Sequence, residues 1–453
     1  MKALIQKLIN PGESLRWRTI QGSALMVFTE GYTQGIRLAG NLIMTRLLYP
    51  EAFGIMLIVN LVMIALEQFS DAGVKPAVYL HSQGREEKYL NTAWVIMSCR
   101  GLLLTLIALV SAWPLSIIYG TPELFGVLII ASFSALITGF ESPQQIINER
   151  DVKRFKIMLL DIIPPTIAIV TGIILLLFYP SLWVLAAISV IAATVKTALS
   201  FLLFPSINLR FKVDKDIFWE IMHFGKWILV ATAVTYLAAE GDKFIVSGFL
   251  TIEQLGIFSI AITLAKLVEV ISGKLSFLLL MPVYIEIDKQ DDKLAARRKV
   301  KKIKLGFFAL MAPLVIILSL FGSFIVELLY DERYQEAGWM LQVMALGGLF
   351  SMVSNGFNAF ILSKADSYAY SKLNLYRLIV SVMILSAGGY WFGTVGIVYA
   401  IAIAPIASYF ILSMHVRQYN IGQMKVDLML FSAILALVFT VWYYYGWPGL
   451  SKY

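Results

Sequence analysis

Apolar segments of about 20 residues or more recur along nearly the whole chain, and this pattern constrains the fold more than any other feature. A helix needs about 20 mostly apolar residues to cross the hydrocarbon of a bilayer. With 59% hydrophobic and only 15% charged residues, the composition also indicates a polytopic membrane protein. We predict thirteen membrane helices, near residues 19–45, 52–80, 92–119, 121–147, 156–179, 182–205, 218–249, 252–284, 303–330, 337–362, 369–392, 394–416 and 427–446.

The connections between these segments indicate which side of the membrane each one faces. The 37 lysines and arginines gather mainly in every second connection, as in RDVKRFK (150–156) and RFKVDK (210–215). Because cytoplasmic loops are enriched in both residues, we predict a cytoplasmic N-terminus and a C-terminus on the outer side of the membrane. The start of the chain contains no signal-peptide core, which predicts a retained tail. Membrane topology thus accounts for the net charge of +8, and we expect no nucleic-acid partner.

Residues suited to metal binding or catalysis are scarce. Cys99 is the only cysteine, and the three histidines, His81, His223 and His415, are far apart in the sequence. A site built from several cysteines is therefore excluded, and we predict neither a metal nor a cofactor. The predicted outer turns YPEAFG, YGTPEL and YDERYQ contain no histidine. This disfavours a membrane acyltransferase or glycosyltransferase, so we predict no catalytic residues.

A weak internal repeat links the two halves of the chain. The segment LIMTRLLYPEAFGIM (42–56) aligns with FIVSGFLTIEQLGIF (244–258) after a shift of 202 residues, which places Gly54 over Gly256. Both copies lie at the predicted turn between the first and second spans of a half. Since six predicted helices separate them, the halves insert with the same orientation and are related by an axis along the membrane normal.

Three motifs carry a resemblance to a known family: RLLYPEAFGI (46–55), INERDVKRFK (147–156) and GDKFIVSGFLTIEQLGIFSIA (241–261). At these residues the chain resembles the polysaccharide-exporter branch of the multidrug/oligosaccharidyl-lipid/polysaccharide exporter superfamily, the Wzx-type and colanic-acid-exporter-like flippases. The resemblance implies an all-α polytopic fold with two six-helix lobes around a central cleft. Its lobes would be residues 1–205 and 218–417, with a cytoplasmic linker at 206–217 and an extra transmembrane helix within 418–453.

The resemblance also implies an activity. A polyprenyl-diphosphate-linked oligosaccharide, the precursor of an exopolysaccharide or O-antigen, would cross the inner membrane by alternating access. The implied partners are this lipid-linked glycan, membrane lipids, and polysaccharide polymerase or export machinery. An ion-coupled multidrug exporter of the same superfamily is the alternative.

Ionisable residues interrupt several of the predicted spans. In WILVATAVTYLAAEGDKFIVSGFL (227–250), three charged residues occur within four positions. Each costs roughly 2.5–3.5 kcal/mol near the bilayer centre, so a lipid-facing position is disfavoured. Glu30 and Arg37 share one face of the first span, and Lys266 and Glu269 share one face of the eighth. We predict that these faces meet at a hydrated cleft.

The basic residues in the spans are candidates for substrate binding. A diphosphate loses its hydration on leaving water, and a fixed lysine or arginine offsets that cost, arginine through a bidentate fork. We predict that Arg37, Lys243 and Lys266 bind the substrate in a cationic cleft. Five further candidates lie near the cytoplasmic ends of their spans, where snorkelling to the interface explains them equally well: Lys75, Arg100, Lys196, Lys274 and Arg377.

The acidic residues in the spans have two interpretations. Glu30, Glu67, Asp71, Glu240, Asp242 and Glu269 are candidates for coupling transport to a proton or sodium ion. The alternative is that they are ion-pair partners of the basic residues. The expected pairs are then Glu30 with Arg37, Asp71 with Lys75, and Asp242 with Lys243 or Lys266.

Overall fold

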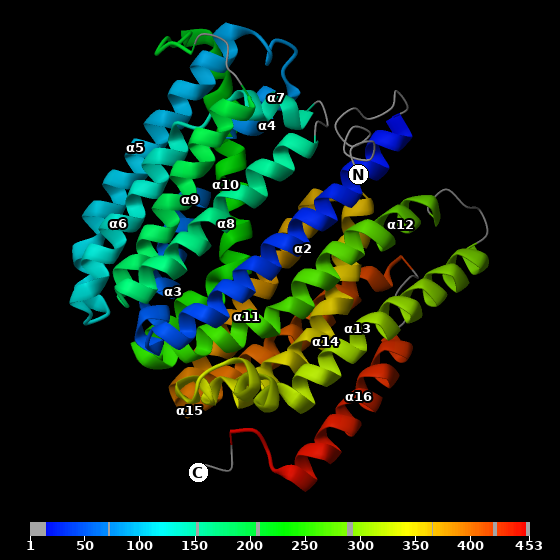
Figure 1. Ribbon diagram of the computed structural model, residues 1–453. Helices are drawn as coiled ribbons and strands as arrows, with labels where there is room; N and C mark the ends of the chain where they lie inside the picture. The colour runs from blue at the N-terminus through cyan, green and yellow to red at the C-terminus, as the bar shows by residue number, and fades with distance from the viewer. Residues whose placement is uncertain are drawn as a thin grey trace, which may run out of the picture. The chain divides into compact units, whose positions relative to one another are not determined.

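The computed structural model describes residues 15–70, 73–150, 154–204, 209–287, 293–364, 366–419 and 424–449 (Figure 1). Every regular element among these residues is a helix, which confirms the predicted all-α class. The chain forms two compact units. Unit 1 comprises Met1–Leu48 and Ile58–Ala233, and unit 2 comprises Tyr49–Leu57 and Val234–Tyr453. The division falls inside two helices, α3 (Pro50–Phe69) and α10 (Lys215–Phe249).

Unit 1 is a helix bundle held together by close helix approaches. Besides its parts of α3 and α10, it contains α2 (Leu15–Leu47), α4 (Val74–Leu80), α5 (Glu87–Ile118), α6 (Pro122–Gly139), α7 (Gln144–Arg150), α8 (Arg154–Phe178) and α9 (Leu182–Leu203). Gly101 of α5 faces Gly139 of α6, and a Cβ built on Gly101 would lie 3.0 Å from the Gly139 Cα. Gly40 of α2 packs against Ile169 of α8. Small residues allow such approaches in membrane bundles, where van der Waals contact is a main source of helix association.

Unit 2 is built around one central helix. It contains α11 (Ile252–Leu275), the π-helical turn η1 (Ser276–Leu280), α12 (Met281–Ile287), α13 (Lys293–Leu329), the 3-10 turn η2 (Glu332–Tyr334), α14 (Glu336–Ser363), α15 (Ser367–Arg417) and α16 (Met424–Tyr445). The central helix is α14, which packs against α11, α13 and α15. Most of its side chains are therefore buried, including the whole stretch from Val343 to Phe350.

Eleven helices of the described residues are long and apolar enough to cross a membrane, which confirms the predicted multi-pass character. One of them, Tyr368–Arg417, contains a break at Gly393 (φ 56°, ψ −138°) and covers the predicted spans 369–392 and 394–416. The first predicted span lies in α2, which has 33 residues but does not belong to the eleven. Since α2 carries many polar side chains, its polar face needs surroundings other than lipid.

Two predicted spans are each two helices. The segment 52–80 contains α3 and α4, and Gly73 just before α4 adopts a φ of 63°, which ends any continuous helix. The segment 121–147 contains α6 and α7, which are separated at Ser142 and Pro143, because the residue before a proline disfavours the helical conformation. The predicted lobe and linker boundaries stay predictions, since the compact units divide within α3 and α10.

The two copies of the sequence repeat meet inside unit 2. Gly54 lies against the backbone carbonyl of Ile252, and Gly256 lies against the backbone carbonyl of Pro50. In the repeat alignment, Pro50 corresponds to Ile252 and Gly54 corresponds to Gly256, so the two contacts are equivalent. A Cβ atom at either glycine would collide with the main chain of the other turn. The close approach therefore requires glycine at both positions.

The C-terminal helix α16 is joined to unit 2 by a buried ion pair. Figure 1 shows α16 in red beside α13, which it contacts. Nζ of Lys304 in α13 lies 2.6 Å from Oδ1 of Asp427 in α16, whose side chain is 1% exposed. The hydroxyl of Tyr409 in α15 donates to Oδ2 of Asp427 at 3.1 Å. One carboxylate thus connects three helices.

Candidate functional site

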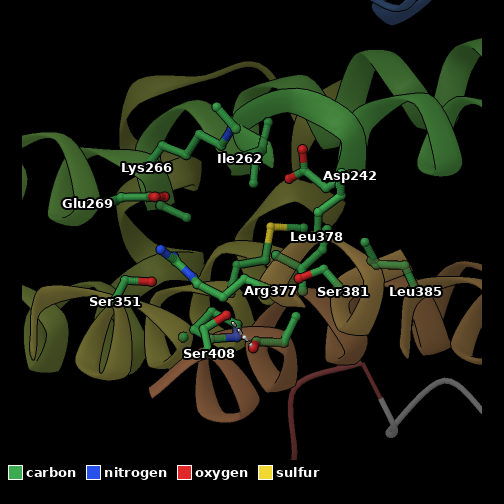
Figure 2. Close-up of a pocket in the computed structure, with 18 of the residues that line it drawn as sticks. Asp242, Ile262, Lys266, Glu269, Ser351, Arg377, Leu378, Ser381, Leu385 and Ser408 are labelled. Carbon is green, nitrogen blue, oxygen red and sulfur yellow. Dashed lines mark hydrogen bonds between the residues drawn. The ribbon is translucent and has the colours of Figure 1, made fainter. Parts of the chain in front are cut away.

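A pocket of about 130 Å³ lies among α10, α11, α14 and α15 of unit 2 (Figure 2). Its charged lining residues are Asp242, Lys266, Glu269 and Arg377, and its hydroxyl groups come from Ser351, Ser381 and Ser408. Pro405 also lines the pocket and has no N–H, so the carbonyl of Ile401 is without its usual helical partner. The pocket therefore offers both donors and acceptors within a membrane-spanning unit.

Glu240 of α10 holds two of the predicted substrate-binding lysines. Lys243 forms an ion pair with its Oε2, and Nζ of Lys266 in α11 lies 3.5 Å from the same atom. Among the described residues the Asp242 side chain forms an ion pair with neither lysine, although it lies within electrostatic range of Lys266. Residues three apart share a helix face, whereas adjacent residues do not, so Glu240 and not Asp242 lies beside Lys243. The Asp242 carboxylate instead accepts a hydrogen bond from the Lys243 backbone N–H at 2.9 Å.

Arg377 of α15 presents a partly unsatisfied guanidinium to the pocket. Its Nη1 donates to Oδ1 of Asn374 at 3.1 Å. Its Nε is buried and finds no hydrogen-bond partner among the described residues. Figure 2 shows the side chains of Arg377 and Glu269 pointing toward one another across the pocket. Because a buried donor without a partner is costly, this atom is suited to an acceptor on a ligand or water.

Unit 1 contains a second pocket, of about 270 Å³, with a similar pair of cations. Lys75 and Arg100 line it together with Glu67, Gln68 and Gln145. Nε of Arg100 donates to Oγ of Ser70 at 2.9 Å, and its Nη2 donates to the backbone carbonyl of Glu67. Nζ of Lys75 lies 2.6 Å from a carboxylate oxygen of Glu149. These contacts fix both cations in place at the pocket wall.

A buried ion pair in unit 1 includes a residue that the sequence analysis missed. Nζ of Lys196 in α9 lies 3.0 Å from Oε1 of Glu141, whose side chain is 3% exposed. Asp161 of α8, also not predicted, lies within electrostatic range of Lys196. Glu141 follows α6 directly in the structure but lies inside the predicted span 121–147. A charge within that predicted span was the available signal.

Arg37 has an exposed side chain and, unlike Lys75, Lys196, Lys243 and Lys266, forms no ion pair with a described residue. Glu30, Gln34, Arg37 and Asn41 follow one side of α2. A neighbouring side of the helix packs on α8, where Gly40 meets Ile169 and Tyr32 hydrogen-bonds Thr166 at 3.2 Å. No hydrogen bond or ion pair joins the Arg37 side chain to any described residue, so the expected pairing with Glu30 is wrong. A separation of seven residues places the two side chains two helical turns apart.

Thiol labelling tests whether the polar side of α2 faces water. In a background with Cys99 replaced by serine, we expect Arg37→Cys to react with a membrane-impermeant charged thiol reagent, because a lipid-facing thiol remains protonated and unreactive. Thr45→Cys is the matched control on the same helix, since Thr45 is 0% exposed. Equal protection of positions 37 and 45 from both sides of the membrane would show that this side of α2 is not hydrated.

The remaining predicted site residues form no further cluster in the part of the chain that the structure describes. Lys274 lies exposed in the last turn of α11. Asp71, and with it the expected pair with Lys75, lies outside the described residues. Within the described part of the chain, no group of three or more His, Cys, Asp or Glu side chains is arranged to hold a metal ion.

Comparison with known proteins gives a family and two informative relatives. Residues 43–338 match a family described as "Polysaccharide biosynthesis protein". The amylovoran biosynthesis protein AmsL of Erwinia amylovora is 23% identical over 322 residues, which cover 69% of this chain and 80% of that protein. The lipopolysaccharide biosynthesis protein WzxC of Escherichia coli K12 is 20% identical over 422 residues, covering 88% of this chain and 82% of the relative.

Solved structures with the same fold are membrane transporters. The lipid II flippase MurJ in an inward closed conformation superimposes with a TM-score of 0.72 at 13% identity, covering 93% of this chain and 92% of that one. An inward-facing multidrug resistance MATE family transporter of the MOP superfamily gives 0.64 at 15% identity, with 86% and 96% covered. At these identities the likeness shows the fold, and it confirms the predicted MATE-like architecture.

Proposed function

Because this chain belongs to the polysaccharide biosynthesis protein family, we propose that it is a flippase for a polyprenyl-diphosphate-linked oligosaccharide. The glycan would pass from the cytoplasmic to the outer leaflet of the inner membrane by alternating access. The relatives named for amylovoran and lipopolysaccharide biosynthesis support a cell-surface glycan as the cargo. The fold shared with a lipid II flippase supports a lipid-linked substrate.

The observation that carries this proposal is the exposed guanidinium of Arg37 on a polar membrane-length helix. A diphosphate needs compensation for its lost hydration, and arginine supplies it through two parallel N–H donors. Lysines 75, 196, 243 and 266 are each held by a carboxylate in the structure, whereas Arg37 makes no such contact with a described residue. Arg37 is therefore the cation best placed to receive an external anion.

The pocket of unit 2 would act as a second contact on the headgroup or as the coupling site. Arg377 has a donor without a partner, which suits a phosphate oxygen or a sugar hydroxyl. The carboxylates of Asp242 and Glu269 line the same pocket and would balance its charge or take up a proton or sodium ion. Transport that persists after both an uncoupler and sodium removal would exclude the coupling role.

The proposal also specifies how the protein is oriented in the membrane and what uses its product. The distribution of basic loops supports an N-terminus in the cytoplasm and a C-terminus in the periplasm. A flippase in this orientation delivers its glycan to the outer leaflet, where polymerase or export machinery would use it. We propose a transporter without catalytic residues, which needs no cofactor for the transfer itself.

Replacement of Arg37 by alanine tests the proposal. We expect export of the surface glycan to fall about ten- to a hundredfold, because a charge-assisted hydrogen bond contributes about 1.5–3 kcal/mol. Membrane levels of the variant should be normal, since the exposed Arg37 side chain forms no hydrogen bond or ion pair with a described residue. Glycan export is measured in cells that lack the native gene and carry the variant on a plasmid.

Two controls belong with that experiment. Arg37→Lys keeps the charge without the fork and should retain partial export. Arg210→Ala removes an exposed loop arginine and should leave export unchanged. If the Arg37→Ala variant exports glycan normally, Arg37 does not bind the headgroup. The exposed guanidinium of Arg37 then no longer supports the proposed flippase function.

A multidrug exporter is the second candidate function, favoured by the two carboxylates in the unit 2 pocket. Such groups suit organic cations. Drug resistance conferred on a sensitive host, lost in Asp242→Asn and present without any glycan phenotype, would select this alternative.

A further inference from the structure

A third cavity, of about 420 Å³, lies at one end of unit 2 and has no part in the headgroup site described above. The end of α13 contributes Ser323 and Glu327, and the beginning of α14 contributes Glu336, Trp339 and Gln342. The segment after α16 completes the wall with Gly446–Gly449, which include Trp447. The cavity is therefore formed by three segments that are distant in sequence.

The backbone after α16 is folded to place Trp447 at this cavity. Gly446 (φ 102°) and Gly449 (φ 78°) adopt left-handed conformations, which turn the chain back at the end of the helix. The hydroxyl of Tyr399 donates to the carbonyl of Pro448 at 3.0 Å and fixes the turn. The Trp447 ring centroid lies 5.8 Å from that of Trp442 and 5.4 Å from that of Phe439. The indole packs against these two rings and remains 39% exposed.

Among the described residues, the lining combines indole rings with hydrogen-bond acceptors and contains no cationic side chain. Trp339 and Trp447 provide apolar faces, while Glu327 and Glu336 provide carboxylates. Glu327 forms no hydrogen bond or ion pair with a described residue, so its oxygens are available. A sugar ring has an apolar C–H face that fits an indole and hydroxyl groups that donate to carboxylates. The described residues of the lining include no lysine or arginine, which disfavours uronic acids and phosphates.

We propose that this cavity binds a neutral or amino sugar unit of the transported glycan. The inference rests on the proposed flippase function for its biological cargo. The turn between α13 and α14 lies on the side that the loop charges assign to the periplasm, so the cavity would receive sugar after translocation. An interfacial aromatic belt would explain the two tryptophans alone. It would not explain the two carboxylates that line the same cavity.

Saccharide binding to the purified full-length protein in nanodiscs tests this inference. The probes are chitotetraose, its deacetylated form and tetragalacturonate, which are neutral, cationic and anionic oligomers of equal length. We expect chitotetraose or its deacetylated form to bind and tetragalacturonate not to bind, as measured by saturation-transfer NMR. Trp447→Ala should weaken this binding at least tenfold and Glu327→Gln about threefold.

The controls distinguish binding in the cavity from binding at the membrane surface. They also distinguish failure of this inference from failure of the proposed function. Trp391→Ala removes a 70% exposed tryptophan elsewhere in unit 2 and should leave saccharide binding unchanged. Glu327→Gln alters an exposed side chain and reports on the site even if Trp447→Ala fails to fold. Binding of no probe, equal binding of all three, or insensitivity to both variants would overturn the inference. Normal saccharide binding in a protein that fails to flip lipid-linked glycan would refute the proposed function alone.

Discussion

Asp427→Ala is expected to destabilise the protein by about 3–5 kcal/mol, because it leaves the Lys304 ammonium buried without its counter-ion. The Lys304 side chain is 14% exposed, and its Nζ lies 4.9 Å from the Phe357 ring, so little water can replace the carboxylate. Tyr409 also loses the acceptor of its hydroxyl. The unfolding free energy in mixed micelles, measured by titration with dodecyl sulfate, checks this result.

A double variant separates the cost of breaking the pair from its net contribution. Lys304→Met combined with Asp427→Leu should recover most of the stability, because apolar side chains of similar volume avoid the desolvation of two charges. If the double variant is as unstable as Asp427→Ala, the loss comes from packing between α13 and α16 and not from the unpaired ammonium.

Gly256→Ala should cost about 3 kcal/mol, the upper range for overpacking, because the new methyl group meets main-chain atoms. A Cβ at this position would collide with the carbonyl of Pro50 and lie 3.0 Å from its Cα. Backbone cannot rotate away as a flexible side chain does. Gly54→Ala should have a similar effect, since its Cβ would meet the carbonyl of Ile252. The same unfolding titration measures both variants.

Gly306→Ala is the matched control for this steric argument. Gly306 lies in α13, and nothing lies within 4 Å of a Cβ built on it. Alanine is favoured over glycine in a helix by about 0.5–1 kcal/mol, so this variant should be slightly more stable than the natural protein. A loss of stability in Gly306→Ala equal to that in Gly256→Ala would contradict the steric argument, because a Cβ at Gly306 has no neighbouring atom to collide with.

The sequence predicted the helical class, most of the spans and the polar side of α2, because these depend on composition and periodicity over 20 or more residues. It also predicted that Lys243 and Lys266 would have acidic neighbours. The pairing of both with Glu240 required the three-dimensional positions of α10 and α11. The sequence analysis paired these lysines with Asp242, because it considered neighbours in the sequence and not the faces of α10 and α11.

Ion pairs between residues that are distant in the sequence could not be predicted from a single sequence. Glu141 and Lys196 lie on separate elements, and no periodic pattern relates them. The same holds for Lys304 and Asp427, although both were visible as charges at the ends of apolar segments. The break before α4 was missed although Asp71, Gly73 and Pro76 interrupt the apolar pattern there. In the structure α3 ends at Phe69, and Gly73 adopts a left-handed φ.

The reciprocal contact between the two repeat turns has the geometry of a homodimer interface. In such an interface, position i of one subunit touches position j of the other, and position j of the first touches position i of the second. Gly54 with Ile252 and Gly256 with Pro50 follow this rule within one polypeptide. An ancestral protein of half this length would thus have associated with a second copy through this turn, and gene duplication followed by fusion would have preserved both glycines.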